Sequence, residues 1–411
     1  MNPTTTPLAE QLRIILLGLR NSGKSSLINS IFENEISIVS DIPGTTTDPV
    51  TKSIELSSLG PVAITDTAGI DDEGTLGNLR IKKTLEFINI ADIVLFTTKI
   101  NTPPTQVEQY HIEKLQTTRK HFLLVLTFSD ENPHPEKLSW AEKFNFVKVS
   151  NKNKTGISKL KEKLISLSKT LEPEIKPLDG LVQPNDLLLL VVPIDYSAPK
   201  GRLILPQVET IRDALDKNCA SLVVKENELK YFYYQLKTPP KLVITDSQAF
   251  HKVASIIPEE QLLTSFSILF ARKKGDLQLF VKHIKSLSLI KPKSKILIIE
   301  SCHHHILPDD IGTIKIPQLF SKFVQKDCQF EVVRELPEEQ KLNEFSLAIH
   351  CAGCMVTRKK VLTRIELLNK YNIPSINYGL FFAYVNDLLP RALKPFAEEY
   401  KTYLQNCSYK L

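Results

Sequence analysis

The chain has 411 residues, of which 42% are hydrophobic and 24% are charged. This composition is typical of a globular protein, and the length predicts two to three domains with substantial cores. The net charge of +6 comes from 52 basic and 46 acidic residues spread along the chain, which argues only weakly for a nucleic-acid or membrane partner.

Targeting and disulfide patterns are missing from the sequence. The longest clean apolar run, Leu187 to Pro193, is far too short to span a bilayer. The first residues do not combine a basic region with an apolar stretch, as a signal peptide would. Six cysteines in so long a chain do not resemble a disulfide framework. We therefore expect a cytoplasmic protein with no membrane and no nucleic-acid partner.

The N-terminal part of the chain carries a phosphate-binding pattern. A predicted strand runs into Gly18 to Ser25, which matches G-x-x-x-x-G-K-[ST] in full, and a helix is predicted to follow. The backbone of such a loop cradles phosphates, Lys24 supplies positive charge, and Ser25 offers a hydroxyl to Mg²⁺. The candidate nucleotide-binding residues of the loop are Gly18, Asn21, Ser22, Gly23, Lys24, Ser25 and Ser26.

Two later stretches fit the switch loops of a GTPase. Pro43 to Asp48 carries hydroxyls for Mg²⁺, with Thr46 as the candidate ligand. Asp66 follows a predicted strand and suits the Mg²⁺ shell, and the N–H of Gly69 can contact the γ-phosphate. The candidate catalytic residues are Lys24, Thr46, Asp66 and Gly69.

Base recognition is predicted at the end of a later strand, in Thr127 to Asp130. Asp130 can accept hydrogen bonds from guanine N1 and N2, so GTP is the expected nucleotide. Thr127 and Phe128 stand where related GTPases have Asn and Lys of N-K-x-D, and we therefore expect weaker nucleotide affinity. Ser150 and Asn151 loosely match the last base-contacting loop.

This set of motifs resembles the TrmE/Era branch of GTPases. The resemblance implies a Ras-like mixed sheet. Ile70 stands where Ras-like enzymes carry a water-orienting Gln, and members of this branch can use K⁺ in place of an arginine finger. In this chain the resemblance assigns the K⁺ site to Asn21 and to backbone carbonyls of Ser40 and Ile42, so that GTP hydrolysis is expected to be K⁺-stimulated.

A linker from Leu171 to Gly180 precedes a second α/β stretch with strands predicted at 187–192, 222–224 and 242–244. So few strands leave an exposed sheet edge. Pairing of that edge with a second copy predicts a homodimer, and a higher oligomer stays open.

Two strands near the C-terminal end are each followed by Cys and His. Residues 296–299 lead to Cys302-His303-His304, and residues 347–349 lead to His350-Cys351 and Cys354. Ligand sites in such sheets lie beyond the carboxyl ends of strands, so we predict a metal site there. Zinc and an iron–sulfur cluster both fit. The candidate ligands are Cys302, His304, His350, Cys351 and Cys354; the fourth ligand stays open between His303, His304, His305, His350 and an exogenous group.

Over its whole length the chain resembles the HydF family of [FeFe]-hydrogenase maturation GTPases. The resemblance rests on the GTPase motifs, on the segment 192–202, and on the C-x-H…H-C-x-x-C pattern. It implies three α/β domains: a P-loop GTPase domain at 1–172, a dimerisation domain at 173–260, and a doubly wound cluster-binding domain at 261–411.

The same resemblance implies the function. A [4Fe–4S] cluster would be held by Cys302, Cys351 and Cys354, with its fourth iron site exchangeable. The protein would act as a scaffold or carrier for a transient diiron precursor. Two radical-SAM maturases would supply that precursor, and apo-[FeFe]-hydrogenase would receive it.

Two other functions stay open as alternatives. The chain could be a TrmE/Era-like GTPase acting on the ribosome or tRNA, with a zinc-stabilised C-terminal domain; that function needs a concentrated basic face or stacking aromatics. It could also be a redox sensor that forms a reversible disulfide between Cys351 and Cys354.

Overall fold

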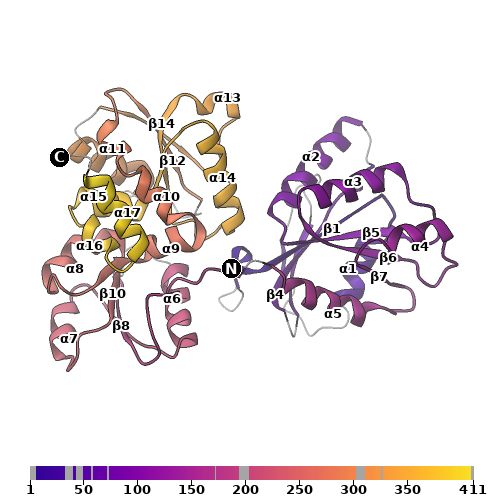
Figure 1. Cartoon of the computed structure of the whole chain (residues 1–411), viewed down its shortest axis with the longest axis horizontal. Helices are drawn as coiled ribbons and strands as arrows, with labels where there is room; N and C mark the ends of the chain where they lie inside the picture. Colours follow the sequence, from indigo (N-terminus) through magenta and orange to yellow (C-terminus); the bar gives the residue numbers. More distant parts are fainter. Residues whose placement is uncertain are drawn as a thin grey trace. The chain divides into compact units, whose positions relative to one another are not determined.

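The computed structural model describes residues 6–32, 40–42, 50–56, 59–71, 74–171, 173–193, 203–301, 311–324 and 327–408. The chain forms two compact units, which comprise residues 1–173 and 174–411. Figure 1 shows that strands and helices are combined in both units. The predicted α/β fold class is confirmed.

The first unit is built on a mixed sheet with the strand order β2-β3-β4-β1-β5-β6-β7. β3 pairs antiparallel with both β2 and β4, and the other neighbours pair in parallel. The strands are β1 (Leu12–Gly18), β2 (Ser40–Ile42), β3 (Val50–Leu56), β4 (Gly60–Asp66), β5 (Ile93–Lys99), β6 (His121–Thr127) and β7 (Phe146–Lys148). The helices are α1 (Lys24–Phe32), α2 (Gly74–Ile90), α3 (Gln106–Thr117), α4 (Pro135–Ala141) and α5 (Ile157–Ser168).

The central strands of this sheet are buried on both faces. Ile14 and Leu16 of β1 belong to one apolar core, whereas Ile15 and Leu17 belong to another on the opposite face. Successive side chains of a strand point to opposite faces, so a continuous apolar run serves both cores. This packing fixes β1 as the rigid support from which the phosphate loop emerges.

A buried ion pair braces the first unit. Lys137 of α4 and Glu108 of α3 lie 2.9 Å apart and are almost fully excluded from solvent. The Lys137 Nζ also donates to Thr98 Oγ1 of β5 at 2.7 Å. Burial lowers the pKa of Lys137, and the neighbouring Glu108 carboxylate opposes that shift. The pair thus ties two helices to the strand that ends beside the candidate nucleotide site.

The second unit contains two parallel sheets, with the orders β11-β10-β8-β9 and β13-β12-β14-β15. The strands of the first sheet are β8 (Leu187–Val191), β9 (Ala220–Val224), β10 (Leu242–Thr245) and β11 (Leu263–Ser265). The strands of the second sheet are β12 (Lys295–Ile299), β13 (Gln329–Val333), β14 (Phe345–His350) and β15 (Ser375–Asn377).

Helices surround both sheets of the second unit (Figure 1), and the two sheets contribute to one large shared apolar core. Its helices are α6 (Leu205–Asp216), α7 (Leu229–Gln235), α8 (Phe250–Ile256), α9 (Phe266–Lys274), α10 (Leu277–His283), α11 (Ser286–Leu289), α12 (Ile316–Leu319), α13 (Glu339–Leu342), α14 (Arg358–Lys370), α15 (Tyr378–Val385), α16 (Leu389–Leu393) and α17 (Ala397–Ser408). Helix α9 contacts β11 of one sheet and β15 of the other. The two sheets are therefore parts of one packed body.

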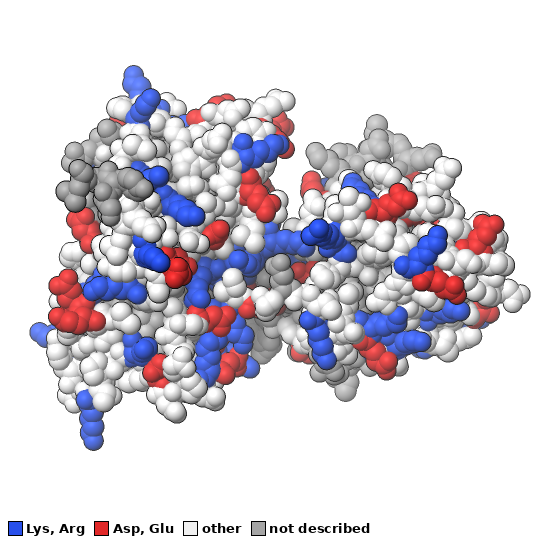
Figure 2. Space-filling view, viewed as in Figure 1, with Lys and Arg blue, Asp and Glu red and all other residues white. Residues whose placement is uncertain are grey.

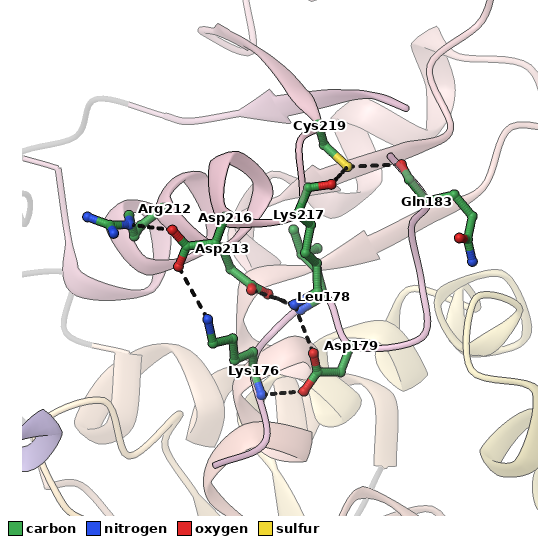
Figure 3. Close-up of polar contacts among 9 residues, drawn as sticks. All are labelled: Lys176, Leu178, Asp179, Gln183, Arg212, Asp213, Asp216, Lys217 and Cys219. Carbon is green, nitrogen blue, oxygen red and sulfur yellow. Dashed lines mark hydrogen bonds and ion pairs between the residues drawn. The ribbon is translucent and has the colours of Figure 1, made fainter. Parts of the chain in front are cut away.

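A polar network holds the segment that opens the second unit against helix α6 (Figure 3). Buried Asp213 accepts a hydrogen bond from the Leu178 N–H at 2.8 Å and pairs with the Lys217 Nζ at 2.6 Å. The Lys217 Nζ also pairs with Asp179 at 2.8 Å. Burial alone would raise the pKa of Asp179, but the Lys217 ammonium and a backbone N–H bring it below its ordinary value.

Asp213 is expected to be the key residue of this network. Replacing it with Ala leaves the buried Leu178 N–H without its acceptor, which costs about 1–3 kcal/mol. Hydrogen–deuterium exchange at the Leu178 amide should therefore accelerate by roughly 5- to 100-fold. Asp216→Ala is the matched control, because its ion pairs with Lys176 and Arg212 are exposed and contribute little. Equal protection of the Leu178 amide in both variants would contradict this account.

Candidate functional site

The phosphate loop lies between β1 and α1. The Lys24 side chain is buried, and its Nζ donates to Gly18 O at 3.1 Å and to Leu19 O at 2.9 Å. Gly18 has a φ of +156°, and a Cβ at this position would collide with the backbone oxygen of Thr97. The Lys24 ammonium therefore binds carbonyl oxygens of its own loop. The phosphates of a bound nucleotide can replace these oxygens as its partners.

The predicted Mg²⁺ residues meet at the end of β4. The β1–β4 register places Asp66 opposite Leu16, just before the phosphate loop. The Ser25 Oγ donates to Asp66 Oδ2 at 2.6 Å. Asp66 Oδ1 is buried and has no hydrogen-bond partner among the described residues. A hydroxyl and an unsatisfied carboxylate oxygen fit the oxygen ligands that Mg²⁺ prefers. Thr46, the third predicted ligand, lies outside the described residues.

The loop after β4 packs directly on the phosphate loop. Asp71 Oδ1 accepts a hydrogen bond from the Arg20 N–H at 2.7 Å, and the Ile70 N–H donates to Gly18 O at 3.3 Å. A Cβ at Gly69 would lie 2.9 Å from the Arg20 nitrogen, so only glycine fits. Ile70 is buried in the apolar core, which means that no side chain at this position is available to orient water.

The residues assigned to K⁺ are only partly placed. Asn21 is exposed on the phosphate loop and has a φ of +58°. Ser40 and Ile42 belong to β2, which pairs with β3. The K⁺ site stays a prediction.

The base-recognition loop follows β6. The Ser150 Oγ donates to Asp130 Oδ1 at 2.5 Å, and this hydrogen bond is the main cause of the lowered pKa of Asp130. The exposed carboxylate is thereby kept ionised, as guanine recognition requires. Phe128 has a φ of +58°, and the Lys99 Nζ lies 5.6 Å from the centre of its ring. Lys99 therefore places a positive charge beside the Phe128 ring, although Phe128 itself replaces the Lys of the N-K-x-D motif.

The second predicted site lies at the carboxyl ends of β12 and β14. These strands are parallel neighbours, and their register pairs Ile299 with His350. The Cys351 N–H donates to Ile299 O at 3.0 Å, and the Ser301 N–H lies 3.3 Å from Cys351 Sγ. Among the described residues, neither Cys351 nor Cys354 belongs to a disulfide. The residue after Ser301 in the sequence is Cys302, which lies outside the described residues together with His303, His304 and His305.

The cluster ligands stay predictions. Within the part of the chain that the structure describes, no three His, Cys, Asp or Glu side chains form a group that could hold a metal. His350 is buried, and its ring centre lies 5.7 Å from that of Phe280. Burial, and secondarily the charge of Arg364, lowers the pKa of His350 to about 3, so this imidazole is neutral.

Two arginines of α14 make contacts that were not singled out from the sequence. Arg364 is buried; its guanidinium donates to Ser301 Oγ beside the end of β12 at 2.7 Å and pairs with Glu335 at 2.9 Å. Arg358 donates to carbonyls at and just after the end of α9, among them Lys273 O at 2.8 Å and Gly275 O at 2.7 Å. The sequence offered one signal for Arg364, since it lies three residues after Val361 on the inward face of the helix.

Charge is mixed on the visible face of each unit. Figure 2 shows Lys and Arg interspersed with Asp and Glu. No helix of the described part is both long and apolar enough to cross a membrane.

Family models match three successive parts of the chain. Residues 13–128 match a 50S ribosome-binding GTPase, residues 178–275 the hydrogen maturase F dimerization domain, and residues 278–395 the hydrogen maturase F tetramerization domain. Fold, phosphate loop and matches define a P-loop GTPase joined to oligomerization domains of the hydrogen-maturase type. The chain belongs to the hydrogen maturase F (HydF) family, and the resemblance noted from the sequence is confirmed.

Other known proteins are similar to the chain at its GTPase unit. The tRNA modification GTPase MnmE of Clostridioides difficile (strain 630) is 31% identical over 180 residues, which are 43% of this chain and 39% of MnmE. MnmE of Acinetobacter baylyi is 34% identical over 158 residues, which are 37% of this chain and 33% of MnmE. The chain thus spans well under half the length of these relatives.

A solved structure covers a similar part of the chain. The G domain of the T. maritima FeoB iron transporter is 21% identical and covers 39% of this chain and 99% of that domain, with a TM-score of 0.30. Together with the matched family model, the motifs support GTP and Mg²⁺ as ligands of this unit.

Proposed function

We propose that this HydF-family GTPase is a scaffold or carrier that delivers a diiron precursor to apo-[FeFe]-hydrogenase. The observation that carries the proposal is the shared edge of β12 and β14. There, the Ser301 N–H lies 3.3 Å from Cys351 Sγ, so the two halves of the C-x-H…H-C-x-x-C pattern follow strand ends that are in contact. Two strand ends that are in contact, each followed by Cys and His in the sequence, support a metal site that neither strand could form alone.

The residues at this edge fit a [4Fe–4S] cluster. Cys302, Cys351 and Cys354 would hold it, and such a cluster supplies one iron whose remaining position can take an outside ligand. Thiolates carry negative charge, which nearby cations stabilise. Arg364, bound to Ser301 Oγ at 2.7 Å, places a buried positive charge beside the strand end. His304, His350 and an exogenous group all stay candidates for the fourth position.

Oligomerization is proposed to use the free edge of the first sheet of the second unit. β9 ends that sheet, and its Val223 is 42% exposed. An edge strand with an exposed apolar residue favours pairing with a second copy. The match of residues 178–275 to a dimerization domain supports a homodimer, and the match of 278–395 to a tetramerization domain supports a higher oligomer.

GTP turnover is proposed to act as a switch for partner exchange. Loop 66–71 contacts the phosphate loop through the Arg20–Asp71 and Ile70–Gly18 hydrogen bonds, so a bound γ-phosphate can shift its equilibrium. The partners would be two radical-SAM maturases, which supply the precursor, and the apo-hydrogenase, which receives it.

The carrier role is tested by transfer of the cargo. The chain is purified anaerobically after coexpression with the two maturases and is mixed with apo-[FeFe]-hydrogenase. We expect hydrogenase activity to appear, and we expect no activity with chain expressed alone. Failure of the loaded chain to activate the apo-enzyme, with cluster iron present, would contradict the carrier role.

Stimulation by K⁺ is expected if Asn21 binds this ion. A cation beside the bridging phosphate oxygens neutralises developing charge, so GTP hydrolysis should be about tenfold faster, or more, in KCl than in NaCl. Asn21→Ala should remove the difference while retaining the rate seen in Na⁺. Steady-state phosphate release measures both, and equal rates in the two salts with the unchanged chain would end the idea.

A further inference from the structure

Guanine presents two hydrogen-bond acceptors, N7 and O6, on the edge that a protein must meet with donors. At the position where related GTPases carry Asn, this chain has Thr127. Its side chain is fully buried, and its hydroxyl donates to Ser22 O at 2.8 Å, with Thr98 O at 3.0 Å as the alternative acceptor. A hydroxyl has a single proton, and both neighbours only accept. Thr127 therefore has no proton left for the base.

Asn151 places an amide beside the same part of the phosphate loop. Its Nδ2 lies 3.4 Å from Gly23 O. A Cβ built on Gly23 would lie 3.4 Å from this Nδ2 and also 3.4 Å from Thr127 Cγ2, so both side chains face Gly23. Because a backbone carbonyl only accepts, the end of the amide that faces Gly23 must be Nδ2. Oδ1 is turned inward, where it is buried and has no hydrogen-bond partner among the described residues.

A short turn fixes Asn151 next to the guanine-binding carboxylate. Ser150 and Thr155 exchange backbone hydrogen bonds of 3.1 and 3.2 Å. Ser150 Oγ accepts from the Asn153 N–H at 3.1 Å and donates to Asp130. Asn151 is therefore held between Asp130, which is predicted to bind guanine N1 and N2, and the phosphate loop.

We propose that the Asn151 side chain donates a hydrogen bond to the N7/O6 edge of guanine and thereby supplies the donor that Thr127 lacks. Nδ2 carries two hydrogens, of which the long contact to Gly23 O uses one. The second is free for the base, next to the carboxylate that is predicted to bind the adjacent N1/N2 edge of guanine. Two roles are thus divided between two residues: Thr127 binds the phosphate loop, and Asn151 binds the base.

This inference rests on guanine-nucleotide binding by the first unit and is independent of the cluster. Competition with fluorescent N-methylanthraniloyl-GDP gives the affinities of the full chain for GDP, for 7-deaza-GDP, which lacks N7, and for 6-thio-GDP, in which a weakly accepting sulfur replaces O6 while N1–H is kept. Asn151→Ala should weaken GDP binding by about three- to tenfold, the value of one hydrogen bond. The exposed Asn153, two residues further on, provides the control variant Asn153→Ala, which should bind GDP as the unchanged chain does.

The analogues show whether the Asn151 side chain contacts the base or only supports the loop. The unchanged chain should prefer GDP over at least one analogue, and this preference should shrink toward one in Asn151→Ala. A variant that binds all three ligands more weakly by the same factor would overturn the inference, because the side chain would then only support the loop. Asn151→Asp, which keeps the shape and removes the donor, replaces the Ala variant if that variant melts at lower temperature. Absence of GDP binding by the unchanged chain would instead overturn the nucleotide-site assignment.

Discussion

Replacing Cys354 by Ala is expected to abolish cluster binding while GTP hydrolysis stays within about twofold of the unchanged chain. Cys354 is a buried cysteine in the loop after β14, and a cluster that loses one of three thiolates has too few protein ligands to persist. The phosphate loop belongs to a different compact unit with its own cores, so its geometry does not depend on this thiol. Iron and acid-labile sulfide are assayed after anaerobic reconstitution, and phosphate release is measured on the same samples.

Cys328 provides the control for this experiment. It is also a cysteine, but it precedes β13 and is absent from the proposed ligand set. Cys328→Ala should retain both iron and hydrolysis. If Cys354→Ala also lost GTP hydrolysis, with its fold intact by circular dichroism, the proposed separation of the two sites would be wrong.

Replacing Lys24 by Ala is expected to reduce kcat for GTP hydrolysis by about 10²- to 10³-fold, as loss of one preorganised charge does in other active sites. The Nζ now rests on Gly18 O and Leu19 O, the loop carbonyls that surround the phosphate position. A bound nucleotide gives this charge the β- and γ-phosphates as partners. Single-turnover hydrolysis at saturating GTP measures the effect.

The exposed Lys159 on α5 serves as the control residue for Lys24. Lys159→Ala should hydrolyse GTP normally, and Lys24→Ala should still bind iron. A Lys24→Ala variant that keeps more than about a tenth of the normal rate would contradict the assignment of this loop as the phosphate site.

The sequence allows predictions of function where the residues concerned are contiguous. The loop from Gly18 to Ser25 matches a complete phosphate-binding motif. Asp66 could be predicted as a Mg²⁺ residue because a recognisable strand precedes it. The family resemblance also followed from short patterns, and the matched domains confirm it. Apolar runs such as Ile296 to Ile299 predicted buried strands correctly, because a strand covered on both faces needs little else.

Contacts between distant segments could not be predicted in this way. Arg358 donates hydrogen bonds to carbonyls more than eighty residues earlier in the chain, and Arg364 donates to Ser301, which lies 63 positions earlier. The role of Asn151 depends on its distance to Gly23, which lies 128 positions earlier. From residue type alone, each of these side chains would be expected to lie exposed on the surface. Only the packing of α14 and of the 150–155 turn gives them a particular partner.

An iron–sulfur cluster held by thiols from two neighbouring strand ends is tested most directly by the metal content of the full chain purified without oxygen, together with electron paramagnetic resonance after reduction. We expect about four iron and four sulfide per chain and a [4Fe–4S] signal that disappears in Cys302→Ala, Cys351→Ala and Cys354→Ala. One zinc per chain with no sulfide, or a reversible Cys351–Cys354 disulfide without iron, would contradict it.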